Sequence, residues 1–118
     1  MIEWFFILLF GHCLADTSLQ TSHMAKGKSR HNSIDVSRVP VGQKPMKLWY
    51  MWLTHHSMIH GGVVWLLTNN VYLGMIESIS HWIIDFFKCD NKYNPIVDQL
   101  LHLGIKLIYC ILITKGVV

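Results

Sequence analysis

The chain has 118 residues, enough for one domain and too few for two separate cores. Charged residues make up only 14% of it, against roughly 25% in soluble proteins, and hydrophobic residues make up 52%. The net charge of +3 is modest, so the distribution of charge along the chain is more informative than its sum. This composition argues against an ordinary soluble domain and favours a membrane protein built from helices.

The first apolar segment runs from about residue 2 to residue 24 and is polar in its second half. Its beginning resembles a signal peptide that ends near Ala15. However, it carries Glu3 where a signal peptide carries Lys or Arg, and the helical pattern continues beyond residue 15. We therefore predict a retained helix of the folded protein over 2–24.

A long polar connection over residues 25–47 follows, and it holds six of the ten Lys and Arg residues but only one acid, Asp35. Because basic loops of membrane proteins stay in the cytoplasm, we predict that this loop is cytoplasmic. Both termini would then lie on the other side of the inner (cytoplasmic) membrane. Membrane lipid is the expected partner of these charges. No nucleic-acid partner is expected, since neither interleaved aromatic residues nor a known nucleic-acid-binding fold accompanies them.

Three more apolar segments complete the chain, at 48–68, 71–89 and 95–114. Between Leu48 and Ile76 there is no Asp, Glu, Lys or Arg, and a membrane span needs only about 20 apolar residues. The Asn69-Asn70 pair is typical of a tight turn, which predicts an antiparallel helical hairpin. Pro95 suits the first turn of the last helix. We therefore expect an all-α fold, a four-helix transmembrane bundle formed by residues 1–118 as a single domain.

Each predicted helix carries acid or histidine side chains at a spacing of four residues, which places them one above the other on a single helix face. The candidate metal ligands are His12, Asp16, His56, His60, His81, Asp85, Asp98 and His102. The residues expected to support them are Gln20, Glu77, Lys88 and Gln99. His31 and Asp35 have the same spacing, but they lie in the polar loop and are interpreted as a chance pair.

The depths of these side chains predict that they meet. At about 1.5 Å per residue from the cytoplasmic end of each helix, the candidate ligands lie within a layer roughly 10 to 18 Å deep, with Asp85 and Asp98 shallower. Ionisable side chains inside a membrane face the bundle interior and pair there. The sequence therefore predicts one polar cluster in the cytoplasmic half of the bundle, with Glu77 nearer the outer interface.

Three interpretations of this cluster stay open. Mixed nitrogen and oxygen donors suit Zn, Mn or Fe, and a bound metal could activate water to hydrolyse a lipid-like phosphate or ester. His56 and His60 would then be ligands or acid–base groups. Alternatively, the polar side chains only hold the helices together in a non-catalytic protein that forms a homo-oligomer or binds a partner. The third interpretation is a proton or ion relay.

Some remaining features have structural interpretations. Gly61-Gly62 favours close helix contact, and Lys106 is expected to pair with an acid in the bundle or to extend towards the interface. Trp49, Tyr50 and Trp52 are interpreted as an interfacial aromatic belt. The three cysteines lack metal-site spacing and are interpreted as packing residues.

Four short blocks of the sequence carry a family resemblance. They are His12-Cys13-Leu14-Ala15-Asp16-Thr17-Ser18-Leu19-Gln20 with Met24-Ala25-Lys26, then His56-x-x-x-His60-Gly61, His81-Trp82-Ile83-Ile84-Asp85-Phe86-Phe87-Lys88 and Asp98-Gln99-Leu100-Leu101-His102. Over nearly the whole chain they resemble the domain of unknown function 3307 family. That resemblance implies a small bacterial or phage membrane protein with no established activity. The His81–Asp85 block is also faintly similar to membrane-bound metal-dependent hydrolases.

Overall fold

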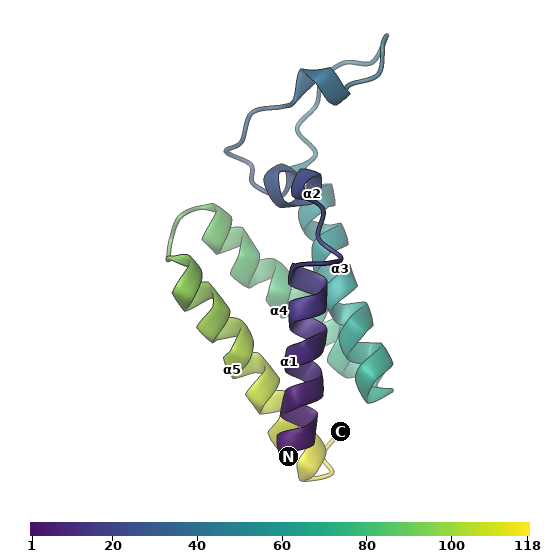
Figure 1. Ribbon diagram of the computed structural model, residues 1–118, viewed down its shortest axis with the longest axis vertical. Coiled ribbons are helices and arrows are strands. Elements are labelled where there is room, and N and C mark those ends of the chain that lie inside the picture. The colour runs from purple at the N-terminus through teal and green to yellow at the C-terminus, as the bar shows by residue number, and fades with distance from the viewer.

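The protein is entirely helical in the computed structural model, which describes all 118 residues. The elements are α1 (Ile2–Asp16), α2 (Ser22–Gly27), a 3₁₀ helix η1 (Val36–Arg38), α3 (Trp49–Thr68), α4 (Val71–Cys89) and α5 (Pro95–Thr114). The predicted all-α class is confirmed. In Figure 1 both termini lie at one end of the elongated molecule, and the polar loop with η1 projects from the other end.

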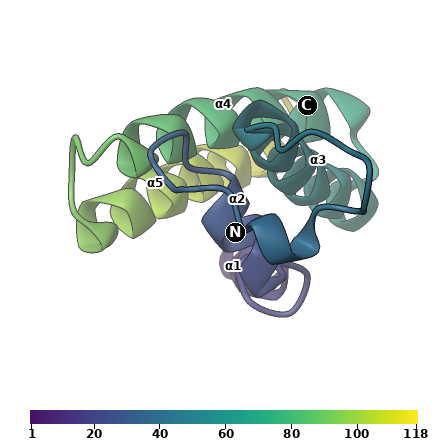
Figure 2. The same ribbon diagram turned by 90° about the horizontal axis from the view of Figure 1, so that it is seen from above.

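The four long helices surround a common interior. Helix α1 packs against α3 and α5, and α4 also packs against α3 and α5, whereas α2 contacts α3. Figure 2 shows the same arrangement from above, with α4 and α5 along one side and α1 facing them across the bundle. Each long helix therefore has one face towards the interior and one face towards the surroundings.

Asparagines at the connections determine where the helices begin and end. Asn69 adopts a left-handed conformation with φ of 52° and ends α3. The side chain of Asn70 then accepts hydrogen bonds from the backbone N–H groups of Tyr72 and Leu73 and caps α4. Asn94 caps α5 in the same way. Capping of this kind allows the tight α3–α4 hairpin that the sequence predicts.

The first helix is shorter than the predicted range of 2–24, because α1 ends at Asp16. The hydroxyl of Thr17 donates to the carbonyl of Cys13, and Thr21 caps the separate helix α2. Small polar side chains such as these compete with helical backbone hydrogen bonds and favour turns and caps. With 15 residues, α1 is about 22 Å long. The helix break places the Asp16 carboxylate at the end of a helix rather than in its middle.

Glycines allow α3 and α4 to approach each other closely. A Cβ atom on Gly61 would lie 1.9 Å from Ser78 Oγ and 2.5 Å from the carbonyl oxygen of Gly74. A Cβ on Gly74 would lie 2.7 Å from the carbonyl oxygen of Gly61. The interpretation of Gly61 as a close-contact residue is confirmed. Gly62, in contrast, faces open space.

The distribution of polar and apolar side chains is the opposite of that in a soluble domain. Eleven buried residues are polar or charged, compared with eight hydrophobic ones. Meanwhile large apolar side chains are exposed on all four long helices, for example Phe6, Leu66, Ile79 and Leu100. An exposed leucine is ordinary in a soluble protein, but a charged interior beneath apolar outer faces is not.

Only α5 is both long enough and apolar enough to cross a membrane. Length and composition thus support one span rather than the four that the sequence predicts. The reason is physical: α1 has only 15 residues, and α4 carries Glu77, Asp85 and Lys88. In α3, histidine and hydroxyl side chains lower the hydropathy although the helix has no Asp, Glu, Lys or Arg.

Candidate metal centre

The structure brings all eight candidate ligands together between the four long helices. Seven of them are buried, and the eighth, Asp16, keeps 22% of its side chain exposed. The imidazole rings lie in contact with one another: His81 stacks on His60 at a centroid distance of 3.5 Å and on His102 at 4.2 Å. The predicted convergence of four helix faces on one polar cluster is therefore present in the fold.

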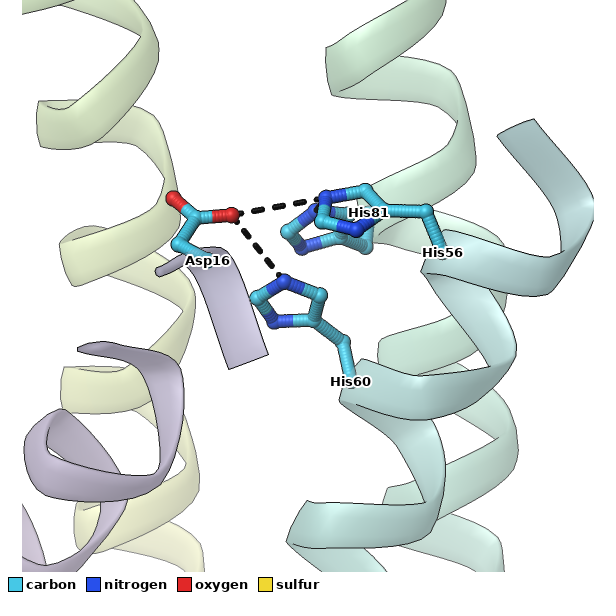
Figure 3. Close-up of side chains that lie close together, drawn as sticks. All are labelled: Asp16, His56, His60 and His81. Carbon is cyan, nitrogen blue, oxygen red and sulfur yellow. Dashed lines mark hydrogen bonds and ion pairs between the residues drawn. The ribbon is translucent and has the colours of Figure 1, made fainter. Parts of the chain in front are cut away.

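One group of four side chains converges on a single point (Figure 3). Asp16 Oδ1 lies 3.1 Å from His60 Nε2 and 3.4 Å from His56 Nε2. His56 Nε2 in turn lies 3.2 Å from His81 Nε2. One potential ligand atom from each of the four lies within 4.8 Å of all the others. The residues come from α1, α3 and α4, so the group joins three helices.

Three of these separations are close to those in a tetrahedral metal site. Zinc bonds of about 2.0–2.2 Å in a tetrahedron put neighbouring ligand atoms about 3.3–3.6 Å apart. Three of the six pairwise separations among Asp16, His56, His60 and His81, at 3.1, 3.2 and 3.4 Å, lie close to that range, and the other pairs lie within 4.8 Å. The group could therefore hold a metal ion.

A second group contains His81, Asp85 and His102. Asp85 Oδ1 lies 3.5 Å from His102 Nε2, and Asp85 Oδ2 lies 3.8 Å from His81 Nε2. However, the ammonium group of Lys28 donates to Asp85 Oδ2 at 2.5 Å, so a cation already pairs with this carboxylate. The second group also shares His81 with the first. The group that contains Asp16 is thus the better candidate for a metal ion.

His12 and Asp98 belong to neither group, although both are buried within the cluster. His12 Nε2 is 3.1 Å from Gln99 Oε1 and 3.5 Å from Asp16 Oδ2. Asp98 Oδ1 is 3.4 Å from His102 Nε2. These two side chains therefore contact the grouped residues and are placed to orient them.

The residues expected to support the ligands differ in what they contact. The Gln99 amide donates to Asp16 Oδ2 at 3.2 Å, which orients that carboxylate. Gln20 instead donates to the backbone carbonyl of Asp16, at 3.0 Å, and holds the end of α1. Lys88 Nζ lies 3.4 Å from Asp98 Oδ2.

Glu77 is buried inside the bundle, and its depth relative to a membrane surface stays a prediction. Its Oε1 atom accepts from the Lys106 ammonium group and lies 3.5 Å from His81 Nδ1. The expectation that Lys106 pairs with an acid in the bundle is confirmed. A carboxylate beside one imidazole nitrogen leaves the other nitrogen free as a metal ligand, and such pairs are usual around metal-bound histidines.

The buried carboxylates are not equally neutralised. Three of the four have a lysine partner: Glu77 with Lys106, Asp85 with Lys28 and Asp98 with Lys88. Asp16 has no lysine or arginine partner, and its oxygens face only histidine side chains and the Gln99 amide. A buried or partly buried charge is costly unless another charge or several hydrogen bonds offset it. Asp16 is thus the position where an added cation would gain most.

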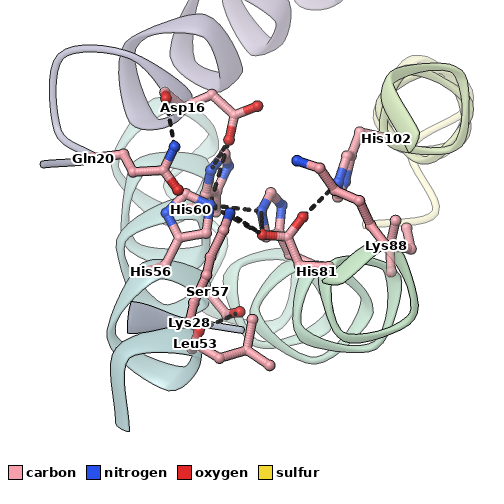
Figure 4. Close-up of polar contacts among 12 residues, drawn as sticks. Asp16, Gln20, Lys28, Leu53, His56, Ser57, His60, His81, Lys88 and His102 are labelled. Atoms are coloured by element: carbon pink, nitrogen blue, oxygen red, sulfur yellow. Dashed lines mark hydrogen bonds and ion pairs between the residues drawn. The ribbon is translucent and has the colours of Figure 1, made fainter. Parts of the chain in front are cut away.

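Sequence reasoning missed Lys28, which was assigned to the basic loop as a topology signal. Its side chain is only 5% exposed and reaches into the cluster from the end of α2 (Figure 4). Helix α2 packs closely on α3 at Gly27, where a Cβ would lie 2.6 Å from Trp52 Cδ1. No pattern in the loop sequence distinguishes Lys28 from its basic neighbours.

The loop is also tied to the α4–α5 connection. Arg30 donates two hydrogen bonds to Asp90, at 3.0 and 2.6 Å, and His31 Nε2 lies 2.9 Å from the same carboxylate. These bonds, above all those from Arg30, hold the pKa of Asp90 below its usual range. His31 therefore pairs with Asp90 and not with Asp35. This agrees with the interpretation of the His31/Asp35 spacing as a chance pair.

Fold and site together define an all-helical protein with a buried histidine–carboxylate cluster that could hold a metal ion. The chain belongs to the family described as protein of unknown function (DUF3307), which matches residues 4–117. The family resemblance of the four sequence blocks is thereby confirmed. No curated protein and no solved structure matches the chain. The geometry of the cluster is therefore the main basis for a function.

Proposed function

We propose that this chain is a membrane-embedded protein that binds one divalent transition metal, Zn, Mn or Fe, through Asp16, His56, His60 and His81. The observation that carries the proposal is the surroundings of Asp16. It is the one carboxylate of the cluster without an ammonium partner, and its Oδ1 atom lies 3.1 and 3.4 Å from two imidazole nitrogens. A divalent ion would neutralise this charge and bind the converging lone pairs.

Hydrogen bonding alone accounts poorly for His56. A neutral imidazole offers one N–H and one lone pair, so Nε2 can serve only one strong partner in each state. Yet His56 Nε2 lies within 3.4 Å of three atoms, which belong to Asp16, Asp85 and His81. These nitrogen and oxygen atoms lie close together with too few N–H groups between them, and a cation shared among them would offset their repulsion. This geometry favours metal binding over a purely structural role.

The membrane part of the proposal is supported by the reversed polarity of the bundle. Helices α1, α3, α4 and α5 turn apolar faces outward, and α4 turns the carboxylates of Glu77 and Asp85 inward to lysine and histidine partners. We propose that all four lie in the inner membrane, with α1 covering only about 22 Å of its thickness. Charges that are paired inside a bundle lower the hydropathy of a helix without contacting lipid.

The placement of the connections supports an orientation. The polar loop and the 90–94 connection lie at one end of the bundle, while the two termini and the α3–α4 turn lie at the other (Figure 1). Under the proposal, the basic end is cytoplasmic and both termini are on the opposite side. The metal site would then lie in the cytoplasmic half of the bundle, next to the helix break that follows α1.

A hydrolytic activity is a further part of the proposal. It needs a position for water on the ion beyond the four protein ligands, which by themselves fill a tetrahedral site, so the ion would have to be five-coordinate. Asp16 is the only one of the four ligands whose side chain is partly exposed. Water would reach the ion at this carboxylate, and a Lewis-acidic ion would lower the pKa of that water. The substrate class would be a phosphate or ester at the membrane surface. Turnover of a model phosphate ester by the metal-loaded protein, and none by the same protein after the ion is removed, tests this part separately.

Elemental analysis of the detergent-purified chain tests the metal site directly. We expect about one bound ion per chain, lost in Asp16→Asn and in His56→Gln. His55→Gln is the matched control, because His55 is the exposed neighbour of His56 on the same helix. Asp98→Asn should also keep the ion. A chain that binds no metal after exposure to Zn, Mn and Fe, or an Asp16→Asn variant that binds as well as the parent, would overturn the proposal.

A further inference from the structure

A basic pocket of about 330 Å³ lies between the polar loop, α2 and the start of α3, outside the histidine–carboxylate cluster. Its cationic side chains are Lys26, Arg38, Lys44 and Lys47, and its only acid is Asp35. Four cations against one carboxylate make a strongly positive concave surface. A cleft lined by one sign of charge concentrates ligands of the opposite sign.

Most of this positive charge has no partner within the protein. Arg38 Nε lies 3.4 Å from Asp35 Oδ2, and Lys47 donates to the backbone carbonyl of Arg30 at 3.0 Å. Lys26 and Lys44 line the pocket without an ion pair. The pocket therefore has two free ammonium groups, and a third whose only recorded bond is to a neutral carbonyl.

One wall of the same pocket is aromatic and apolar. Trp49 and Trp52 line it from the first turn of α3, together with Met46 and Leu48. The His23 ring packs edge-on against Trp52 at a centroid distance of 4.9 Å. Tryptophan beside basic residues is typical of the membrane–water interface, where one part of a ligand is apolar and the other charged.

We propose that this pocket binds the phosphate headgroup of an anionic membrane amphiphile, with the ammonium groups on the phosphate and the tryptophans along the apolar part next to it. A phosphate monoester carries up to two negative charges and several acceptor oxygens, which suits two free lysines and an arginine. A free phosphate ion would use the cations alone, whereas an amphiphile also uses the aromatic wall. The pocket does not depend on the proposed metal ion.

A binding titration on the full chain in nonionic detergent tests this inference. The probes are short-chain phosphatidic acid, phosphatidylcholine with the same chains, and inorganic phosphate, each followed by tryptophan fluorescence. We expect phosphatidic acid to bind at least tenfold more tightly than the other two. The double variant Lys26→Gln/Lys44→Gln should weaken its binding about 25-fold, at about fivefold for each basic residue near an anionic surface.

The matched control is Lys92→Gln/Lys115→Gln, which removes the same charge from exposed positions outside the pocket and should change affinity less than twofold. Equal weakening in both double variants would overturn the pocket as the site. Equal binding of inorganic phosphate would overturn the amphiphile, and so would displacement by a short RNA at equimolar phosphate. The same titration after chelation should be unchanged, so failure of the metal proposal and failure of this one can be told apart.

Discussion

The buried ion pair between Lys106 of α5 and Glu77 of α4 allows a quantitative test of the bundle interior. Each residue is only 1% exposed, and the Lys106 ammonium group donates to Glu77 Oε1. Lys106→Met keeps an unbranched side chain of similar length but removes the charge, so Glu77 remains buried without a cation. Removing one partner of a buried pair costs about 3–5 kcal/mol. We expect a loss of stability of this size.

The assay is thermal unfolding in detergent, followed by near-ultraviolet circular dichroism. For a chain of this size, a loss of about 3–5 kcal/mol corresponds to a lowering of Tm on the order of 10–20 °C. Lys106→Met/Glu77→Gln should recover most of it, because no unpaired charge then remains and the amide can still accept a hydrogen bond near His81. Lys115→Met is the control, since Lys115 ends the same helix and is exposed.

The reasoning fails if Lys106→Met unfolds at the same temperature as Lys115→Met. It also fails if the double variant is as unstable as Lys106→Met alone, because the cost would then come from lost packing and not from an unpaired charge.

Three further predictions concern packing, surface charge and metal binding. Gly61→Ala should destabilise the protein by about 1–3 kcal/mol through the clash with Ser78, whereas Gly62→Ala should stabilise it by up to about 1 kcal/mol. The same unfolding assay measures both variants, and equal effects would contradict the close α3–α4 contact. Arg30→Gln should raise the pKa of Asp90, measured by carboxyl NMR titration, because Arg30 is the main cause of its lowered value. Because folding lowers the pKa of Asp90, the ionised carboxylate stabilises the fold above the pKa of an unfolded aspartate, and this stabilisation is lost as the pH falls through the pKa of folded Asp90. An unchanged Asp90 titration in Arg30→Gln would show that the loop does not dock on the α4–α5 connection. Metal occupancy should fall as the pH is lowered below about 6, because protons compete with the metal for the imidazole ligands, and metal binding should release protons. A metal occupancy that stays constant from about pH 5 to 8 would contradict histidine ligation.

Much of the cluster could be predicted because it depends on local periodicity. A spacing of four residues places both members of a pair on one helix face, whatever the helix packs against. Pairs on adjacent antiparallel helices then meet if their distances from the helix ends agree. The predicted ranges 48–68, 71–89 and 95–114 differ from the observed α3, α4 and α5 by at most one residue. Depth along the bundle could therefore be counted correctly.

The rest depends on tertiary contacts that leave no periodic pattern. The position of Lys28 is determined by how the six-residue helix α2 docks on α3 near Trp52. The end of α1 at Asp16 depends on competition between side-chain and backbone hydrogen bonds, which a hydropathy pattern does not register. Which four of the eight candidate residues converge on one point depends on helix rotation and rotamers. The spacing of residues in the sequence does not determine helix rotation or rotamers.

The lysine pairs and the histidine group hold different parts of the bundle together. Lys106–Glu77 and Lys88–Asp98 link α4 to α5, and Lys28–Asp85 links the end of α2 to α4. None of these pairs involves α1. Helix α1 joins the cluster through His12 and Asp16, whose partners are histidines and Gln99. A protein that needed the cluster only as interhelical glue could have used a lysine here as well. Asp16 is instead surrounded by imidazoles and the Gln99 amide, so the ion that we propose would add a link between α1 and helices α3 and α4.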